Sequence, residues 1–175
     1  MKHILVIVDM QNDFVDGALG TPEARAIVEP VVELIRQGGY DRVFATRDTH
    51  GPEYLSTQEG KQLPVPHCIK GTPGWELVPA VAAALKDARA VLVDKPTFGS
   101  FDLSVRVRAA CGDDEARITV AGLCTDICVV TNALLLKTAL PEADLRVVTA
   151  ACAGVTPESH AAALRTMEAC QIRLV

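Results

Sequence analysis

The stretch Ile4-Leu5-Val6-Ile7-Val8, which is followed directly by Asp9, decides how this chain folds. Its five residues are apolar and mostly β-branched, which is typical of a strand that is buried on both faces. Strands of this kind occur in parallel sheets that helices cover on both sides. We therefore expect the rest of the chain to alternate between helices and strands.

The remaining sequence has this alternation. Val28–Gln37 places its apolar residues at helical spacing, and the pair Gly38-Gly39 ends the predicted helix. Six strands that alternate with helices predict a three-layer α/β/α fold with a six-stranded, mostly parallel sheet. By the same criteria, further strands are expected at 42–46, 90–93, 118–123, 145–149 and 172–175, and further helices at 75–85, 103–110, 125–138 and 157–168.

Length and composition restrict the class of protein. A chain of 175 residues and 18.6 kDa suits a single domain over residues 1–175. The net charge is −5 and no Lys/Arg cluster is present, which argues against a nucleic-acid partner. No apolar run approaches the roughly 18 residues of a membrane-spanning helix. The N-terminus lacks the pattern of a signal peptide, so we expect a cytoplasmic protein with six reduced cysteines.

Charged residues stand at the ends of the first three predicted strands, namely Asp9, Asp48 and Lys95. In parallel α/β folds, the ligand crevice lies at the carboxyl ends of the strands. Any one polar residue at such a position is explained equally well as the residue that ends the strand. Three charged residues at three strand ends favour a common site.

The segment Asp48–Gly74 has no helical or strand periodicity, although it is not low in complexity. Loops longer than about 12–15 residues within a domain are usually functional or disordered, and we expect this one to be ordered. Five of the seven aromatic residues fall in or beside the segments after the first three strands. They either line an apolar pocket or cap the core beneath the loop: Phe14, Tyr54, Trp75, Phe98 and Phe101.

Cys128 is the candidate nucleophile, within the stretch Gly122-Leu123-Cys124-Thr125-Asp126-Ile127-Cys128-Val129-Val130. This stretch is expected to turn from a strand into a helix, whose first N–H groups would lower the pKa of the thiol and could bind an oxyanion. Asp9 is a candidate proton acceptor, and Lys95 would favour both negative charges. A cysteine in such a pattern can also be a buried structural residue.

Taken together, these motifs resemble those of the isochorismatase-like cysteine hydrolases, and within them the nicotinamidases. The resemblance rests on Val8-Asp9-Met10-Gln11-Asn12-Asp13-Phe14, Asp48-Thr49-His50, Lys95 and the turn at Cys128, and extends from residue 4 to about residue 150. It implies an isochorismatase-like fold with Rossmann-like strand order. It also implies a homo-oligomer.

The resemblance assigns roles to individual residues. It implies a catalytic triad of Asp9, Lys95 and Cys128, and an oxyanion hole formed by the backbone N–H groups of Cys124 and Cys128. It further implies a cis peptide bond just before Cys124. Phe14 matches a pocket aromatic of the family, and Phe98 or Phe101 is expected to supply a second wall.

A metal site is expected in the long loop. Asp48 and His50 are two residues apart, so both can face one side of an extended segment, and His67-Cys68 follows. Nitrogen and oxygen donors suit Zn, Fe or Mn. The resemblance implies Asp48, His50 and His67 as ligands, and Glu59 is the expected further ligand, with Glu53 as the alternative. Such a metal, zinc in the first place, would hold the ring of nicotinamide; otherwise these are solvated loop residues.

The stretch Leu63-Pro64-Val65-Pro66-His67 departs from the family, because nicotinamidases commonly carry an aromatic residue there. The leading hypothesis is a nicotinamidase-like amidohydrolase that converts nicotinamide to nicotinate and ammonia through a thioester on Cys128. A second hypothesis is a metal-free hydrolase of another small amide, ureido or carbamoyl compound. A third is a non-catalytic binding protein on this fold, and a vinyl-ether hydrolase acting on isochorismate ranks last.

Overall fold

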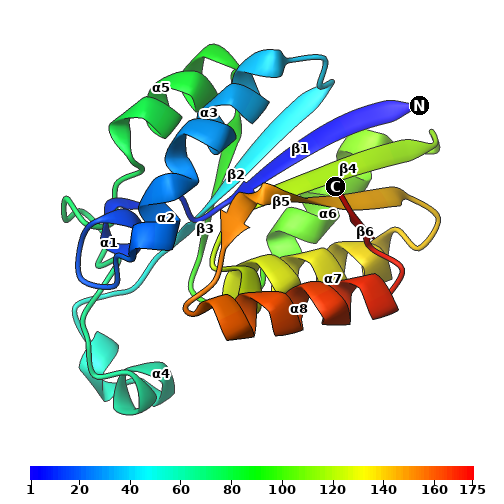
Figure 1. Ribbon diagram of the computed structural model, residues 1–175. Coiled ribbons are helices and arrows are strands. Elements are labelled where there is room, and N and C mark those ends of the chain that lie inside the picture. Colours follow the sequence, from blue (N-terminus) through cyan, green and yellow to red (C-terminus); the bar gives the residue numbers. More distant parts are fainter.

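The computed structural model describes residues 1–175, and its helices and strands alternate along the chain as predicted (Figure 1). One sheet contains all the strands: β1 (Lys2–Val8), β2 (Arg42–Asp48), β3 (Val91–Lys95), β4 (Ala116–Leu123), β5 (Asp144–Ala153) and β6 (Arg173–Leu174). The longer helices are α3 (Val28–Gln37), α5 (Pro79–Asp87), α6 (Phe101–Cys111), α7 (Val130–Ala139) and α8 (Pro157–Ala169). No helix is both long enough and apolar enough to cross a bilayer.

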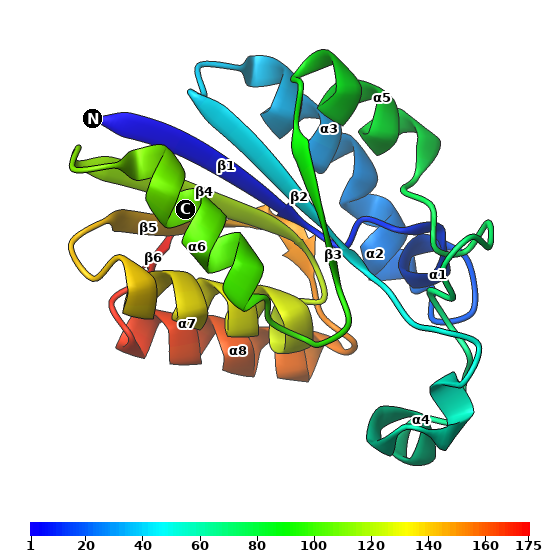
Figure 2. The same ribbon diagram turned by 180° about the vertical axis from the view of Figure 1, so that it is seen from behind.

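The sheet has the strand order β3-β2-β1-β4-β5-β6, and every pair of neighbouring strands is parallel. Helices α3 and α5 cover one face, and α6, α7 and α8 cover the other (Figures 1 and 2). The predicted three-layer fold with Rossmann-like order is therefore confirmed, and the sheet is entirely parallel. The strand order reverses between β1 and β4, which opens a crevice at the carboxyl ends of these two strands.

The core is built around β1. The side chains of Ile4–Val8 are fully buried, because helices cover both faces of this central strand. Burial of a side chain of this type contributes about 1.5–3 kcal/mol. The strand that the sequence pattern identified first thus fixes the position of Asp9 at the floor of the crevice.

Several short elements lack the length that periodicity requires, and the sequence pattern did not predict them. They are α1 (Asn12–Val15), α2 (Pro22–Ala26), α4 (Gln58–Gln62) and the single turn η1 (Tyr54–Ser56). The predicted helix 75–85 begins only at Pro79. Trp75 and Glu76 form a turn and a bend, and Leu77 forms a bridge with Gln11, whose side-chain amide also donates to the Trp75 carbonyl at 2.8 Å.

The predicted helix 125–138 begins with a distinct turn. Residues Thr125–Val129 form a π-helical turn, η2, and α7 continues from Val130. The side chain of Asp126 in η2 accepts hydrogen bonds from the Val155 backbone N–H and from the Ser159 hydroxyl at the start of α8. The His160 ring contacts the Thr125 hydroxyl at 2.8 Å. Helix α8 thus holds this turn in place.

Candidate active site

The three charged strand ends meet at the carboxyl edge of the sheet. Asp9 directly follows β1, and Asp48 and Lys95 are the last residues of β2 and β3. The Lys95 Nζ atom lies 2.7 Å from Asp9 Oδ2 and 3.3 Å from Asp48 Oδ1. It also lies 3.4 Å from the Sγ atom of Cys128. The fold therefore brings together the four residues that the sequence proposed for this edge.

The two carboxylate oxygens of Asp9 differ: one accepts a hydrogen bond from a neighbouring hydroxyl, and the other is available to take up a proton. Its Oδ1 accepts a hydrogen bond of 2.6 Å from the Thr46 hydroxyl. Its Oδ2 is fully buried and, apart from the ion pair with Lys95, has no aligned hydrogen-bond donor. Burial raises the pKa of Asp9, and the positive charge of Lys95 opposes this rise. A carboxylate in this setting can take up a proton from a neighbour.

The Lys95 ammonium remains charged at neutral pH. Burial acts against its charge, but the neighbouring carboxylates of Asp9 and Asp48 outweigh that effect and hold the pKa of Lys95 well above its ordinary value. The pKa of Asp48 shifts in the opposite direction. Although Asp48 is buried, its neighbours His50, His67 and Lys95 keep its pKa well below the ordinary value. The site therefore contains one permanent cation between two carboxylates.

Cys128 differs from the expectation in one respect. The sequence predicted a thiol of lowered pKa, whereas burial and the charge of Asp9 raise the pKa of Cys128 well above its ordinary value, and Lys95 offsets this only in part. The side chain is only 5% exposed and lies within the η2 turn. The pKa of Cys128 is therefore raised and not lowered, because burial outweighs the attraction of the Lys95 ammonium.

The backbone leading to Cys128 has two unusual features. The Leu123–Cys124 peptide bond is cis, which confirms the implication of the resemblance. Gly122 has φ = 122°, and a Cβ atom at this position would collide with the backbone of Val8. Only glycine allows β4 to pass this close to β1 and still turn toward the crevice.

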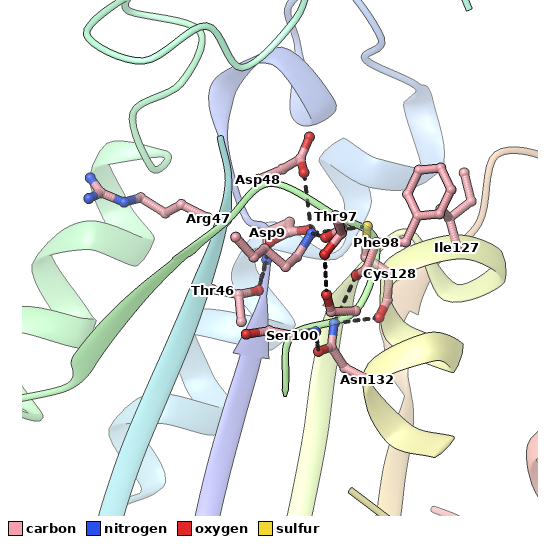
Figure 3. A network of polar contacts seen from close by, with 12 residues as sticks. Asp9, Thr46, Arg47, Asp48, Thr97, Phe98, Ser100, Ile127, Cys128 and Asn132 are labelled. Atoms are coloured by element: carbon pink, nitrogen blue, oxygen red, sulfur yellow. Dashed lines mark hydrogen bonds and ion pairs between the residues drawn. The ribbon is translucent and has the colours of Figure 1, made fainter. Parts of the chain in front are cut away.

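Asn132 connects two segments of the site, a role that the sequence reasoning missed. Its side-chain oxygen accepts a hydrogen bond of 3.0 Å from the Ser100 backbone N–H. Its amide group donates to the carbonyl of Cys128 at 2.8 Å and to that of Phe98 at 3.1 Å (Figure 3). The available signal in the sequence was an amide next to the apolar positions Ala133 and Leu136, on the side of the helix that the structure shows to be buried.

Four potential metal ligands gather beside Lys95. One donor atom each from Asp48, His50, Glu59 and His67 lies within 4.8 Å of all the others. Glu59 comes from the short helix α4, whereas the alternative, Glu53, is not a member of this group. The structure thus brings together the ligand set that the sequence proposed and favours Glu59 over Glu53.

The histidine rings in this group are oriented as metal ligands would be. The Nδ1 atom of His67 faces the Val65 carbonyl at 2.8 Å, which leaves Nε2 free toward the group. The Nε2 atom of His50 is buried and lies 2.8 Å from Asp48 Oδ2, yet it has no aligned hydrogen-bond partner. A cation between these atoms would account for a buried nitrogen of this kind. The residues therefore fit a divalent metal ion.

A cavity of about 740 Å³ connects the two groups of residues, and its lining includes Cys124, Cys128, His67, Phe14 and Phe98. Phe14 and Phe98 are therefore placed as the sequence expected. The prediction for Phe101 requires correction, because this residue is 78% exposed at the start of α6 and does not line the cavity. The inner face of α6 is occupied instead by Leu103 and Val107.

The two large aromatic residues of the loop support the loop and do not line the cavity. Tyr54 is 1% exposed, and its hydroxyl donates to the Leu63 carbonyl at 2.9 Å. Trp75 donates to the Thr49 hydroxyl at 2.9 Å, and the Arg47 guanidinium lies over its ring at 3.8 Å. Both rings thus keep the segment between β2 and α5 ordered, as expected for this loop.

Comparison with known proteins agrees with this geometry. The family model of the isochorismatase domain matches residues 3–175. The chain belongs to the isochorismatase family. The nicotinamidase/pyrazinamidase of Mycobacterium tuberculosis is 31% identical over 191 residues, which cover 98% of this chain and 97% of that protein. This member of the isochorismatase family is therefore a hydrolase that is similar to nicotinamidases over its whole length.

Solved structures show the same relation. The pyrazinamidase/nicotinamidase of Streptococcus mutans superposes with a TM-score of 0.85 at 28% identity, and the match covers 99% of this chain and 100% of that chain. The pyrazinamidase of Pyrococcus horikoshii in complex with zinc has a TM-score of 0.81 at 29% identity, with 100% of this chain and 99% of that chain covered.

Proposed function

We propose that this enzyme hydrolyses nicotinamide to nicotinate and ammonia, with Cys128 as the nucleophile, Asp9 as the proton acceptor and Lys95 as the fixed cation between them. The observation that carries the proposal is the contact of Lys95 with both Asp9 and Cys128, beside a cavity whose lining includes Cys128. Asp48, Glu59 and His67, three members of the cluster that also contains His50, line the same cavity. The names of the Mycobacterium tuberculosis and Streptococcus mutans relatives support the same substrate.

The first half of the reaction forms a thioester. Asp9 takes the proton of the Cys128 thiol, and the sulfur attacks the carbonyl carbon of the amide. The electron pair of the C=O bond moves to oxygen, and the backbone N–H groups of Cys124 and Cys128 stabilise this oxyanion. When the carbonyl forms again, the C–N bond breaks, and Asp9 passes its proton to the departing nitrogen, which leaves as ammonia.

The second half hydrolyses the thioester. Asp9, again ionised, takes a proton from a water molecule, whose oxygen attacks the thioester carbon. Collapse of the second oxyanion breaks the C–S bond and releases nicotinic acid, and the proton on Asp9 returns to the sulfur of Cys128. Lys95 remains protonated throughout, because its raised pKa keeps the ammonium charged, and it stabilises whichever of Asp9 and Cys128 carries the negative charge.

We further propose zinc as the metal held by Asp48, His50, Glu59 and His67. Two imidazoles with two carboxylates suit zinc, iron or manganese, and the Pyrococcus horikoshii relative was solved with zinc. When bound, the metal would supply a Lewis acid for the pyridine nitrogen and so hold the amide above Cys128. Elemental analysis of the purified enzyme tests the assignment, and an absence of any bound metal would favour the metal-free hydrolase.

Ammonia release tests the proposed reaction. Wild-type enzyme should release ammonia from nicotinamide, and Cys128→Ala should lose this activity by a factor of at least about 10⁴, because it removes the thiol that contacts Lys95. Cys170→Ala is the matched control, because Cys170 is an exposed free thiol just after α8, outside the cavity lining, and it should retain full activity. Equal rates in wild type and Cys128→Ala would refute the proposal.

A further inference from the structure

The lining of the cavity extends beyond the catalytic and ligand residues. Its volume of about 740 Å³ falls within the roughly 300–1,000 Å³ range of pockets that hold drug-sized ligands. Nicotinamide is a single ring with one carboxamide. Once this ring lies against Cys128 and His67, a large part of the cavity is still available.

The outer part of the cavity is mainly apolar. Its walls are Leu19 and Ala24 from the α1–α2 region, Leu63 after α4, and Val155 after β5. Leu63 is 38% exposed, Val155 is 52% exposed, and Phe98, which also lines the cavity, is 48% exposed. Exposed apolar side chains that share the wall of one cavity are typical of a ligand-binding groove.

Helix α4 supplies the polar side of this outer part. Gln58 and Gln62 are four residues apart and both line the cavity, as does Glu59 of the metal cluster between them. The helix projects from the body of the molecule on the side where α8 begins (Figures 1 and 2). Neither arginine nor lysine is among the residues that line the cavity. The outer part therefore suits an uncharged, apolar group.

We propose that this enzyme accepts nicotinamides that carry an apolar substituent at ring position 5, and that Leu63 and Val155 determine this specificity. The proposal rests on the proposed amidase function. In the bound ring, the nitrogen faces the Asp48–His67 cluster and the carboxamide faces Cys128. Carbon 2 lies between these two positions, so carbon 5, directly across the ring, points away from both and toward the outer part of the cavity.

The first test is a series of nicotinamide, 5-methyl-, 5-propyl- and 5-pentylnicotinamide. Because each methylene enters an apolar part of the cavity, kcat/KM should rise by about threefold per added methylene until the cavity is full. A second measurement is independent of turnover: calorimetric Kd values on Cys128→Ala should fall by the same factor along the series. N-Propylnicotinamide should be a poor substrate, because its alkyl group lies on the leaving nitrogen.

Variants that fill the outer part should reverse this preference. In Leu63→Trp and Val155→Trp, the ratio of kcat/KM for 5-pentylnicotinamide to that for nicotinamide should drop at least tenfold. The backbone contacts of both residues, to Tyr54 and to Asp126, do not involve their side chains and remain possible. Leu55→Trp is the matched control, because Leu55 is 53% exposed and lies outside the cavity lining, and it should leave the ratio unchanged.

The outcomes separate the two proposals. If the enzyme cleaves nicotinamide but kcat/KM falls from 5-methylnicotinamide onward along the series, the proposed specificity is wrong and the proposed amidase function is retained. A preference for N-propyl over 5-propylnicotinamide, or tryptophan variants that do not alter the ratio, would overturn the specificity as well. Failure to cleave any member of the series would refute the amidase function itself.

Discussion

The substitution Lys95→Met tests the buried charges of the site most directly. The Lys95 side chain is 1% exposed, and its Nζ atom lies 2.7 Å from Asp9 Oδ2 and 3.3 Å from Asp48 Oδ1. At an effective dielectric constant of about 20, each attraction amounts to roughly 5–6 kcal/mol. The methionine variant no longer has to desolvate an ammonium, which offsets part of this sum. We expect a net loss of about 3–5 kcal/mol in the free energy of unfolding.

The loss should depend on pH. Burial already raises the pKa of Asp9 above its ordinary value of 3.8, and removal of Lys95 raises it further. Between the ordinary and the raised pKa, Asp9 holds a proton in the folded variant and has lost it in the unfolded chain. The variant therefore loses stability as the pH rises toward the raised pKa. The difference between wild type and variant should therefore be smaller near about pH 5 than near about pH 8.

Urea unfolding at both pH values, with excess chelator, measures this effect. Lys70→Met is the matched control: Lys70 is 65% exposed and lies 3.8 Å from Asp94, so its loss should cost less than about 1 kcal/mol. The double variant Asp9→Asn/Lys95→Met should be more stable than Lys95→Met, because it removes a carboxylate that would otherwise stand unpaired. A loss of less than about 1 kcal/mol for Lys95→Met at both pH values would refute the reasoning.

Two further predictions concern the metal cluster and the frame around the nucleophile. His67→Ala removes one of four ligands and should weaken zinc binding by roughly a hundredfold in a chelator competition. His3→Ala is the control, because His3 lies outside the cluster, and it should leave the zinc affinity unchanged. Equal zinc affinities of His67→Ala and His3→Ala would exclude His67 as a ligand. Asn132→Ala leaves the buried Ser100 N–H without its partner and should cost about 2–3 kcal/mol and lower kcat. Thr138→Ala, on the exposed side of the same helix, is the control, and matching effects would show that Asn132 has no special role.

The sequence predicted the cluster of charged residues at the strand ends because the topology of a parallel sheet determines their positions. The ends of parallel strands share one edge, so the pattern of strands was enough to place Asp9, Asp48 and Lys95 together. The order of strands came from the family resemblance, which also supplied the roles of His50 and His67. The choice of Glu59 over Glu53 needed the short helix α4, whose five residues carry no periodicity.

Other features depend on packing that no local pattern encodes. The Cys128 thiol has a raised pKa because burial outweighs the attraction of the Lys95 ammonium, and burial depends on the whole fold. Phe101 points to solvent because Leu103 and Val107 occupy the inner face of α6. The contacts of Asn132 with groups 32 and 34 residues away in the chain likewise follow from how α7 packs against α6 and the residues that precede it.

The charges of the inner site also bear on what it binds. The ammonium of Lys95 contacts Asp9 and Asp48, and a third carboxylate, that of Glu59, lies beside His67 in the metal cluster. This leaves two uncompensated negative charges, the number that a divalent metal ion neutralises. The outer walls of the cavity contain no free cation. The second carboxylate of a dicarboxylate such as isochorismate would therefore find no cation in these walls, whereas a neutral carboxamide enters without that cost.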